Sequence, residues 1–187
     1  MKYKFNKTIK KNLNIPNIDI IYANLCEYSE EWHSILHQHP FTELMYILEG
    51  DGHLLLPNSK LPIKKDDLLI LNSDIKHSET GNYQANMKYI AIGIQGINLL
   101  NIEDNKSYDS DFTKNYIVKQ NYRDHHAQIR DLFYKIYSEY KEKDDYYETY
   151  SKLYAEILII NLLRISNKIV LQPNIQKINR CNILKVI

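Results

Sequence analysis

An excess of charge of one sign is missing from this sequence. Its 187 residues include 24 Lys and Arg against 23 Asp and Glu, which gives a formal net charge of +1. Surfaces that bind nucleic acid carry a clustered basic excess. A uniformly basic nucleic-acid surface is therefore excluded for this chain, and any DNA binding would need a part that the chain does not contain.

Long apolar runs and closely spaced cysteines are also missing. The densest apolar run, residues 153–165, is interrupted by charged and polar residues and is shorter than the roughly 20 residues of a membrane-spanning helix. The Lys-rich residues 1–11 are not followed by the apolar region of a secretory signal. Cys26 and Cys181 form no CxxC pair, which is typical of free thiols in a reducing compartment. We therefore expect a cytoplasmic protein with no membrane partner.

The first half of the sequence has the pattern of short β-strands. Brief runs of Ile, Leu and Tyr alternate with turn-forming segments such as Gly50-Asp51-Gly52 and Asn72-Ser73-Asp74. Many short strands at close spacing favour a barrel or a sandwich. The polar stretch 98–120 is expected to be a linker. The predicted strands are 18–25, 43–48, 53–56, 61–64, 68–71 and 88–94.

From residue 121 onward the apolar period changes from two residues to 3.6. Residues 121–170 are predicted to form an antiparallel pair of amphipathic helices, divided by a charged break at 141–145. Asn121 and Asp124 suit the N-terminal cap of the first helix. Its apolar stripe consists of Ile129, Leu132, Phe133, Ile136, Tyr137 and Tyr140.

The second helix is apolar on nearly every side. Asp145 and Glu148 resemble a capping box at its start, and Pro173 is expected to end it. Either the helix pair simply packs on its own barrel, or its apolar surplus forms an interface with a second copy, which would make a homodimer. Some of the candidate apolar positions are expected to face the barrel and some the partner. These positions are Ile129, Phe133, Ile136, Leu153, Ile157 and Ile160.

Four histidines of the strand-rich half could share a polar site, and three of them combine with a glutamate; the four are His37, His39, His53 and His77. His37 and His39 alternate with one residue between them, so both imidazoles share one face of a strand, and Glu43 keeps that parity. His77 follows a turn and is expected to reach the same place from across the barrel. Three imidazoles and one carboxylate suit a divalent Zn, Ni, Mn or Fe ion. The alternative is that the same groups line a pocket without a metal.

This spacing resembles the first cupin motif. The motif residues are His37, His39, Glu43 and Gly50, and a second-motif region at 66–81 contains His77. The resemblance implies a small antiparallel jelly-roll barrel. Several positions depart from the family pattern: Asp66 and Asp74 stand at glycine positions, Asn72 at the proline, Gly81 at the terminal Asn, and Glu31 at the opening Gly of the first motif.

A resemblance over almost the whole chain is carried by the stretches HQHPFTELMYILEGDG, DDLLILNSDIKHSE and MKYIAIGIQGI, followed by two amphipathic helices. This order is similar to the effector-binding and dimerisation region of AraC-type bacterial transcription regulators. The resemblance implies a small-molecule effector, of which a sugar is one candidate, and a C-terminal helix-turn-helix domain that binds DNA. That domain would begin where this chain ends. The expected parts are an arm at 1–15, a cupin barrel at 16–97, the linker at 98–120, the helical hairpin at 121–170 and the start of the DNA-binding domain at 174–187.

A barrel of this size encloses one small ligand. Met45 and Ile47 share the parity of Glu43, so they form either an apolar wall of the pocket or plain core, whereas Tyr46 should point the other way. His53 on the next strand is a further pocket or surface residue. The predicted effector pocket consists of His37, His39, Glu43, Met45, Ile47, His53 and His77, and no catalytic residue is assigned.

The fold class predicted from these patterns is mainly β plus α, a jelly-roll barrel followed by a helix pair. A metal-dependent cupin enzyme, an isomerase or dioxygenase, is the alternative function. Two long amphipathic helices after the barrel are expected in a regulator and unneeded by such an enzyme. The sequence therefore favours a regulator.

Overall fold

The computed structural model of the chain describes residues 15–28, 35–81, 86–101, 116–119, 125–166 and 169–174. Its helices are α1 (His126–Glu142) and α2 (Tyr147–Ile165). Its strands are β1 (Asp19–Glu27), β2 (Thr42–Glu49), β3 (Asp51–Leu56), β4 (Ser59–Lys64), β5 (Leu68–Leu71), β6 (Ser78–Gly81), β7 (Lys88–Gln95), β8 (Ile97–Asn101), β9 (Tyr116–Lys119) and β10 (Ile169–Pro173).

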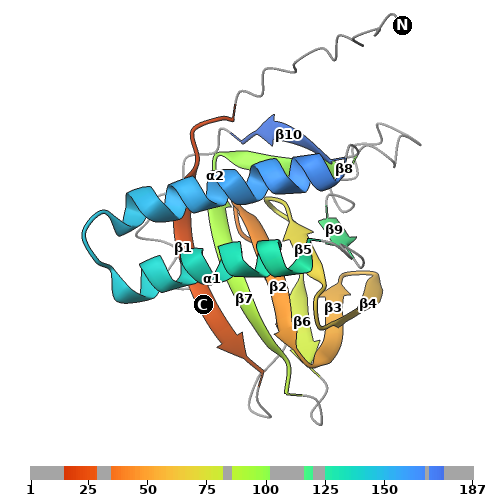
Figure 1. Cartoon of the computed structure of the whole chain (residues 1–187). Coiled ribbons are helices and arrows are strands. Elements are labelled where there is room, and N and C mark those ends of the chain that lie inside the picture. Colours follow the sequence, from red (N-terminus) through yellow and green to blue (C-terminus); the bar gives the residue numbers. More distant parts are fainter. Residues whose placement is uncertain are drawn as a thin grey trace, which may run out of the picture.

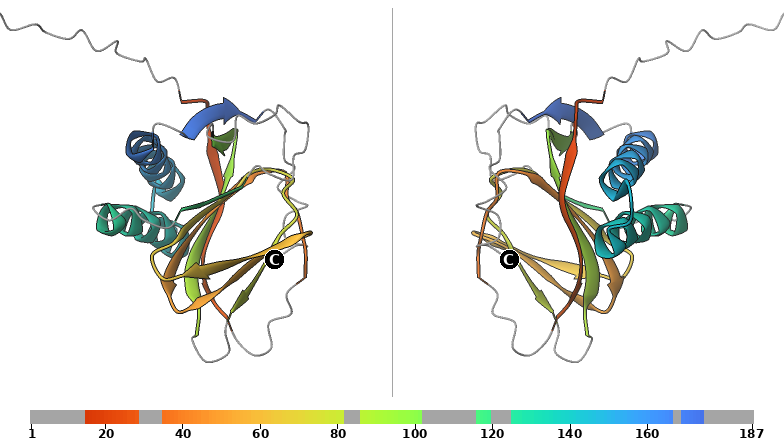
Figure 2. Two further views of the ribbon diagram at one scale, coloured as in Figure 1. Left: turned by 90° about the vertical axis from the view of Figure 1, so that its right-hand side faces the viewer. Right: turned by 90° about the vertical axis from the view of Figure 1, so that its left-hand side faces the viewer.

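Two antiparallel sheets form the jelly-roll-like barrel. One sheet has five strands in the order β1-β7-β2-β5-β9, and the other has three in the order β4-β3-β6. The sheets face each other, and the helices lie outside them (Figure 2). The predicted fold class is therefore confirmed. The apolar residues between the sheets include Met45, Ile47, Leu54, Leu56, Ile63, Leu69, Leu71, Met87 and Tyr89.

The two helices run antiparallel and side by side across the outer face of the five-stranded sheet (Figure 1). Strand β2 alternates, so Leu44, Tyr46 and Leu48 point to the helices while Met45 and Ile47 point inward. The Tyr46 ring lies 5.5 Å from the ring of Phe133, centroid to centroid. The predicted outward direction of Tyr46 is confirmed. No helix in the described ranges combines the length and the apolar character that crossing a membrane requires.

Four described strands were not among those predicted from sequence: β6, β8, β9 and β10. Strands β8 and β9 lie at the two ends of the stretch 98–120, so the expectation of a plain linker is wrong for those ends. Strand β8 is held by tertiary contacts that local composition does not reveal. The buried Asn72 side chain accepts a hydrogen bond from the backbone N–H of Leu99 (2.7 Å) and donates one to its carbonyl (2.9 Å). Strand β8 then pairs with β10.

The helix boundaries also differ from the sequence prediction. Helix α2 is preceded by Tyr146 in a left-handed conformation, with no side-chain cap, so the predicted capping box of Asp145 and Glu148 is wrong. The helix ends at Ile165, because Ser166 is extended, and Pro173 belongs to β10 rather than ending the helix. The predicted cap residues Asn121 and Asp124, most of the arm, and the stretch after residue 174 lie outside the described residues.

Candidate functional site

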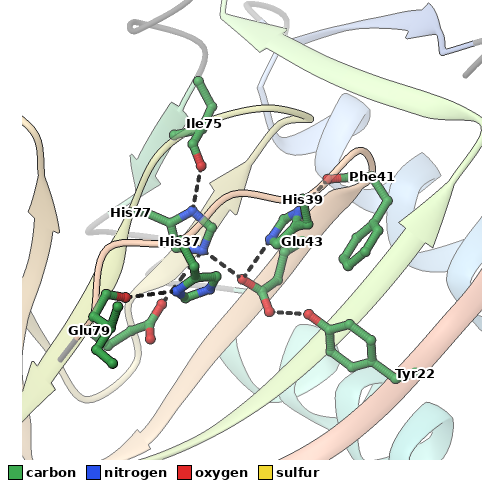
Figure 3. Close-up of polar contacts among 9 residues, drawn as sticks. Tyr22, His37, His39, Phe41, Glu43, Ile75, His77 and Glu79 are labelled. Carbon is green, nitrogen blue, oxygen red and sulfur yellow. Dashed lines mark hydrogen bonds and ion pairs between the residues drawn. The ribbon is translucent and has the colours of Figure 1, made fainter. Parts of the chain in front are cut away.

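The four residues predicted to share a site do meet on the inner face of the barrel (Figure 3). His37 and His77 form an isolated antiparallel bridge, in which the backbone N–H of each donates to the carbonyl of the other at 2.9 and 2.8 Å. His39 follows on the same segment, and Glu43 lies in β2. The backbone pairing therefore brings two distant parts of the chain together and fixes the separation of their side chains.

The side chains of this cluster lie close together. Glu43 Oε2 lies 3.2 Å from His77 Nε2 and 3.5 Å from His39 Nε2. His37, His39 and His77 each offer a ring nitrogen within 4.8 Å of the others. His77 is fully buried, His39 and Glu43 are buried, and His37 is half-buried. These residues have the chemistry and the proximity of a metal site.

The orientation of each imidazole is set by a backbone carbonyl. Nδ1 of His37, His39 and His77 donates to the carbonyls of Ile35 (3.1 Å), Phe41 (2.8 Å) and Ile75 (2.7 Å), respectively. Nδ1 therefore carries the proton, and Nε2 of each ring is the atom left for a ligand. Such outer hydrogen bonds orient histidines that bind metals.

One buried ring nitrogen of the cluster makes no hydrogen bond. Nε2 of His39 is enclosed by protein and makes none. An unsatisfied buried polar atom is costly unless another group satisfies it. A divalent cation beside His39 would bond this nitrogen, so the residues present fit a metal ion.

Burial and mutual charge shift the pKa values of the cluster. Burial acts to raise the pKa of Glu43, but the close imidazoles of His39 and His77, of which His77 is also hydrogen-bonded to Oε2, outweigh it and lower that pKa below its usual range. Burial acts to lower the pKa of His77, but its hydrogen bond to Glu43 and the charge of Glu43 raise it overall. Without a metal, His77 and Glu43 thus form a buried ion pair, and a metal would have to displace the proton on His77 Nε2.

Two residues of the cluster were missed by the sequence analysis. Glu79 lies in β6, and its Oε1 is 3.8 Å from His77 Nε2. Burial, followed by the charge of Glu43, raises the pKa of Glu79 to about 7. Glu79 is two residues after His77, so on a strand both side chains share one face; this spacing could have identified Glu79 from the sequence. Tyr22 donates a hydrogen bond to Glu43 Oε1, and nothing in the sequence indicated this contact.

The contact between Tyr22 and Glu43 depends on a glycine between them. In the register of the sheet, Gly93 of β7 lies opposite Tyr22 on one side and Glu43 on the other. A Cβ atom on Gly93 would come within 2.6 Å of the Tyr22 ring. Because Gly93 has no side chain, the Tyr22 ring can cross this space and reach Glu43. The Tyr22 hydroxyl then bonds Oε1 of Glu43, while Oε2 faces the histidines.

The other predicted pocket residues divide into two groups. Met45 and Ile47 are buried inside the barrel on the strand face that carries Glu43. His53 is half-buried and alternates with Gly52 and Leu54, which are buried, so the structure does not bring it to the cluster. The polar cluster thus lies next to apolar core residues on the same strand face.

The predicted dimerisation residues divide in a similar way. Ile129, Phe133 and Ile136 are fully buried between α1 and the sheet, so none of them is available to a partner. Leu153 and Ile157 on α2 are 49% and 45% exposed, and Ile160 is half-buried. Of the six positions, these three are therefore the ones that face the barrel, and Leu153 and Ile157 stay as candidates for an interface with a partner.

A jelly-roll-like barrel, with histidines and a glutamate on its inner face and two helices on its outer face, defines a cupin-type domain. The model of the AraC-like ligand-binding domain matches residues 25–163 of this sequence. The chain therefore belongs to the family of AraC-like ligand-binding domains.

Two solved structures are similar to the chain, and the first of them, with a TM-score above 0.5, shares its fold. Apo ToxT K231A from Vibrio cholerae is similar with a TM-score of 0.52 and 9% identity, over 82% of this chain and 59% of that one. A cupin protein from Bacteroides fragilis has a TM-score of 0.35 and 17% identity, over 38% of this chain and 63% of that one. The chain thus spans less than two thirds of either structure. No curated protein sequence matches it.

Proposed function

We propose that this chain is the effector-sensing and dimerisation region of an AraC-type transcription regulator. A small molecule binds in the barrel and controls a DNA-binding domain C-terminal to this region. The observation that supports this most is the buried cluster of His37, His39, Glu43 and His77. It lies on the inner face of a family-defined ligand-binding domain and includes a buried ring nitrogen that makes no hydrogen bond.

The cluster also suits a divalent Zn, Ni, Mn or Fe ion, held by His37, His39, Glu43 and His77. A bound ion would supply a Lewis-acidic position for an oxygen atom of the effector. Met45 and Ile47 would contact an apolar part of the same molecule. The effector is therefore small, with an oxygen donor at one end; a sugar hydroxyl or a carboxylate group meets this description.

A connected set of hydrogen bonds links the site to the last described strand. Thr42, next to Glu43, donates to the carbonyl of Ile97 at 2.7 Å. Strand β8 begins at Ile97 and pairs with β10, and the backbone N–H of Asn174 donates to the carbonyl of Gly96 at 2.9 Å. An effector that favours one position of β2 would, through these bonds, favour one position of β10 and Asn174, which lead to the proposed DNA-binding domain.

A second copy of the chain is the proposed partner of α2. Tyr150, Leu153 and Ile157 are about half exposed and lie three or four residues apart, so they form one stripe along the helix. The opposite face of α2 already packs on the barrel and on α1. An apolar stripe on one helix can pair with its own copy about a twofold axis. Two long helices packed outside the barrel are expected in a regulator and unneeded by a barrel enzyme, which is why we propose a regulator rather than an isomerase or dioxygenase.

Effector binding can be tested with a panel of monosaccharides, small carboxylates and amino acids. We expect at least one class to raise the melting temperature of the protein and to bind in calorimetry. The His77→Ala variant should weaken that binding by at least about tenfold, because it removes a polar contact worth about 1.4 kcal/mol or more. The His53→Ala variant is the matched control and should bind as the wild type does. Equal binding by wild type and His77→Ala would place the effector elsewhere and contradict the proposal.

A further inference from the structure

Glu79 is a buried carboxylate that the proposed four-residue metal site does not use. Glu79 lies in β6, two residues after His77, which directly precedes that strand. The side chains of both residues therefore point to the same face. Its exposed fraction is 4%, and Glu43, His77 and Glu79 each offer a donor atom within 4.8 Å of the others. We propose that Glu79 is a fifth protein ligand of the metal ion in this cluster. The inference rests on the metal site of the proposed function.

The possible ligand atoms form two groups of three, and their spacing supports one ion shared by both groups. The first group is His37, His39 and His77, and the second is Glu43, His77 and Glu79. Ligands of one ion with bonds of about 2.1 Å lie about 3 Å apart when adjacent and about 4 Å apart when opposite. The distances from His77 Nε2 to Glu43 and Glu79 are 3.2 and 3.8 Å, and those within each group of three stay below 4.8 Å. His77 belongs to both groups, so an ion bound to His77 lies beside donor atoms of both groups.

The balance of charge supports the same assignment. A divalent ion with three neutral imidazoles and one carboxylate leaves a net charge of +1 in a buried site. Burying an uncompensated charge costs several kcal/mol even after the protein relaxes. The second carboxylate, that of Glu79, makes the site neutral. The Nε2 atom of His39 lies 3.5 Å from Glu43 Oε2, on the side of the ring that meets the carboxylates.

Five protein donors have consequences for the choice of metal and for the effector. Four donors complete the tetrahedral arrangement that structural zinc adopts, whereas Mn, Fe and Ni accept five or six. With Glu79 bound, one position remains for an oxygen atom of the effector. The site would therefore take a ligand through one atom rather than a chelating pair.

The test uses cobalt(II) as the probe on metal-free protein of the full chain. The visible absorption of cobalt is weak when it is five- or six-coordinate and intense when it is tetrahedral. We expect a weak spectrum for the wild type. Glu79→Gln keeps the shape of the side chain but removes the charged ligand. For this variant we expect a more intense spectrum, because cobalt has fewer ligands, and an affinity for cobalt reduced about 10–100-fold.

Glu49→Gln, a substitution of the exposed glutamate at the end of β2, is the matched control and should leave both the spectrum and the affinity unchanged. An intense tetrahedral spectrum of the wild type would overturn the proposal whether or not Glu79→Gln folds. An unchanged spectrum and affinity in a folded Glu79→Gln protein would overturn it as well, while leaving the four-ligand site intact. Absence of cobalt binding by the wild type would overturn both the fifth ligand and the metal site itself.

Discussion

Replacing Ile157 with glutamate is expected to convert a dimer of this chain into a monomer. Ile157 is 45% exposed in the middle of the apolar stripe on α2, so the change should disturb the fold little. At a twofold interface the new carboxylate would be desolvated close to its own copy. We expect the dimer dissociation constant to rise at least about 100-fold, which corresponds to about 2.7 kcal/mol.

Sedimentation equilibrium at tens of micromolar gives the result directly. Leu55→Glu serves as the control, because Leu55 is a half-buried leucine of the three-stranded sheet, which is not the sheet that the helices cover. The control protein should remain a dimer. A wild-type monomer, or a dimer of Ile157→Glu as stable as that of the wild type, would exclude α2 as the interface.

Replacing His39 with alanine is expected to reduce metal affinity by at least about 100-fold. His39 contributes one of the three imidazoles, and its buried Nε2 makes no hydrogen bond that a metal would have to break. Changes in outer hydrogen bonds of metal ligands already cost about 10–100-fold, so loss of a ligand should cost at least as much. Competition with a chromophoric chelator measures the affinity.

His53→Ala provides the comparison for this experiment, since the structure places that imidazole away from the cluster. Its affinity should equal that of the wild type. If instead the two variants lost affinity to the same extent, or neither did, the metal would not be held by the predicted cluster. Circular dichroism of each variant shows whether the barrel remains folded.

The parts of the site that sequence could predict are those encoded by short-range spacing. His37, His39 and Glu43 lie on one stretch whose alternation determines which side chains share a face. The same rule correctly assigned Met45 and Ile47 to the interior and Tyr46 to the exterior. His77 required the cupin spacing as well, because its bridge to His37 joins residues far apart in the chain.

The parts that sequence could not predict depend on the register of distant strands. Tyr22 reaches Glu43 only because β1, β7 and β2 are adjacent and Gly93 lies between them. The position of strand β8 depends on hydrogen bonds from the side chain of Asn72, which is far from it in the sequence. Likewise, the apolar period of α1 shows that one face is covered but not whether a sheet or a second copy covers it.

The most direct test of the central claim is the metal content of protein purified without added metal and without a nickel column. Elemental analysis should find about one equivalent of a transition metal per chain, because the binding of such ions to preformed sites is tight enough to survive purification. The protein should also regain about one equivalent after chelation and incubation with Mn, Fe, Ni or Zn. A content near zero both before and after these incubations would contradict the claim that the His37, His39, Glu43 and His77 cluster is a metal site.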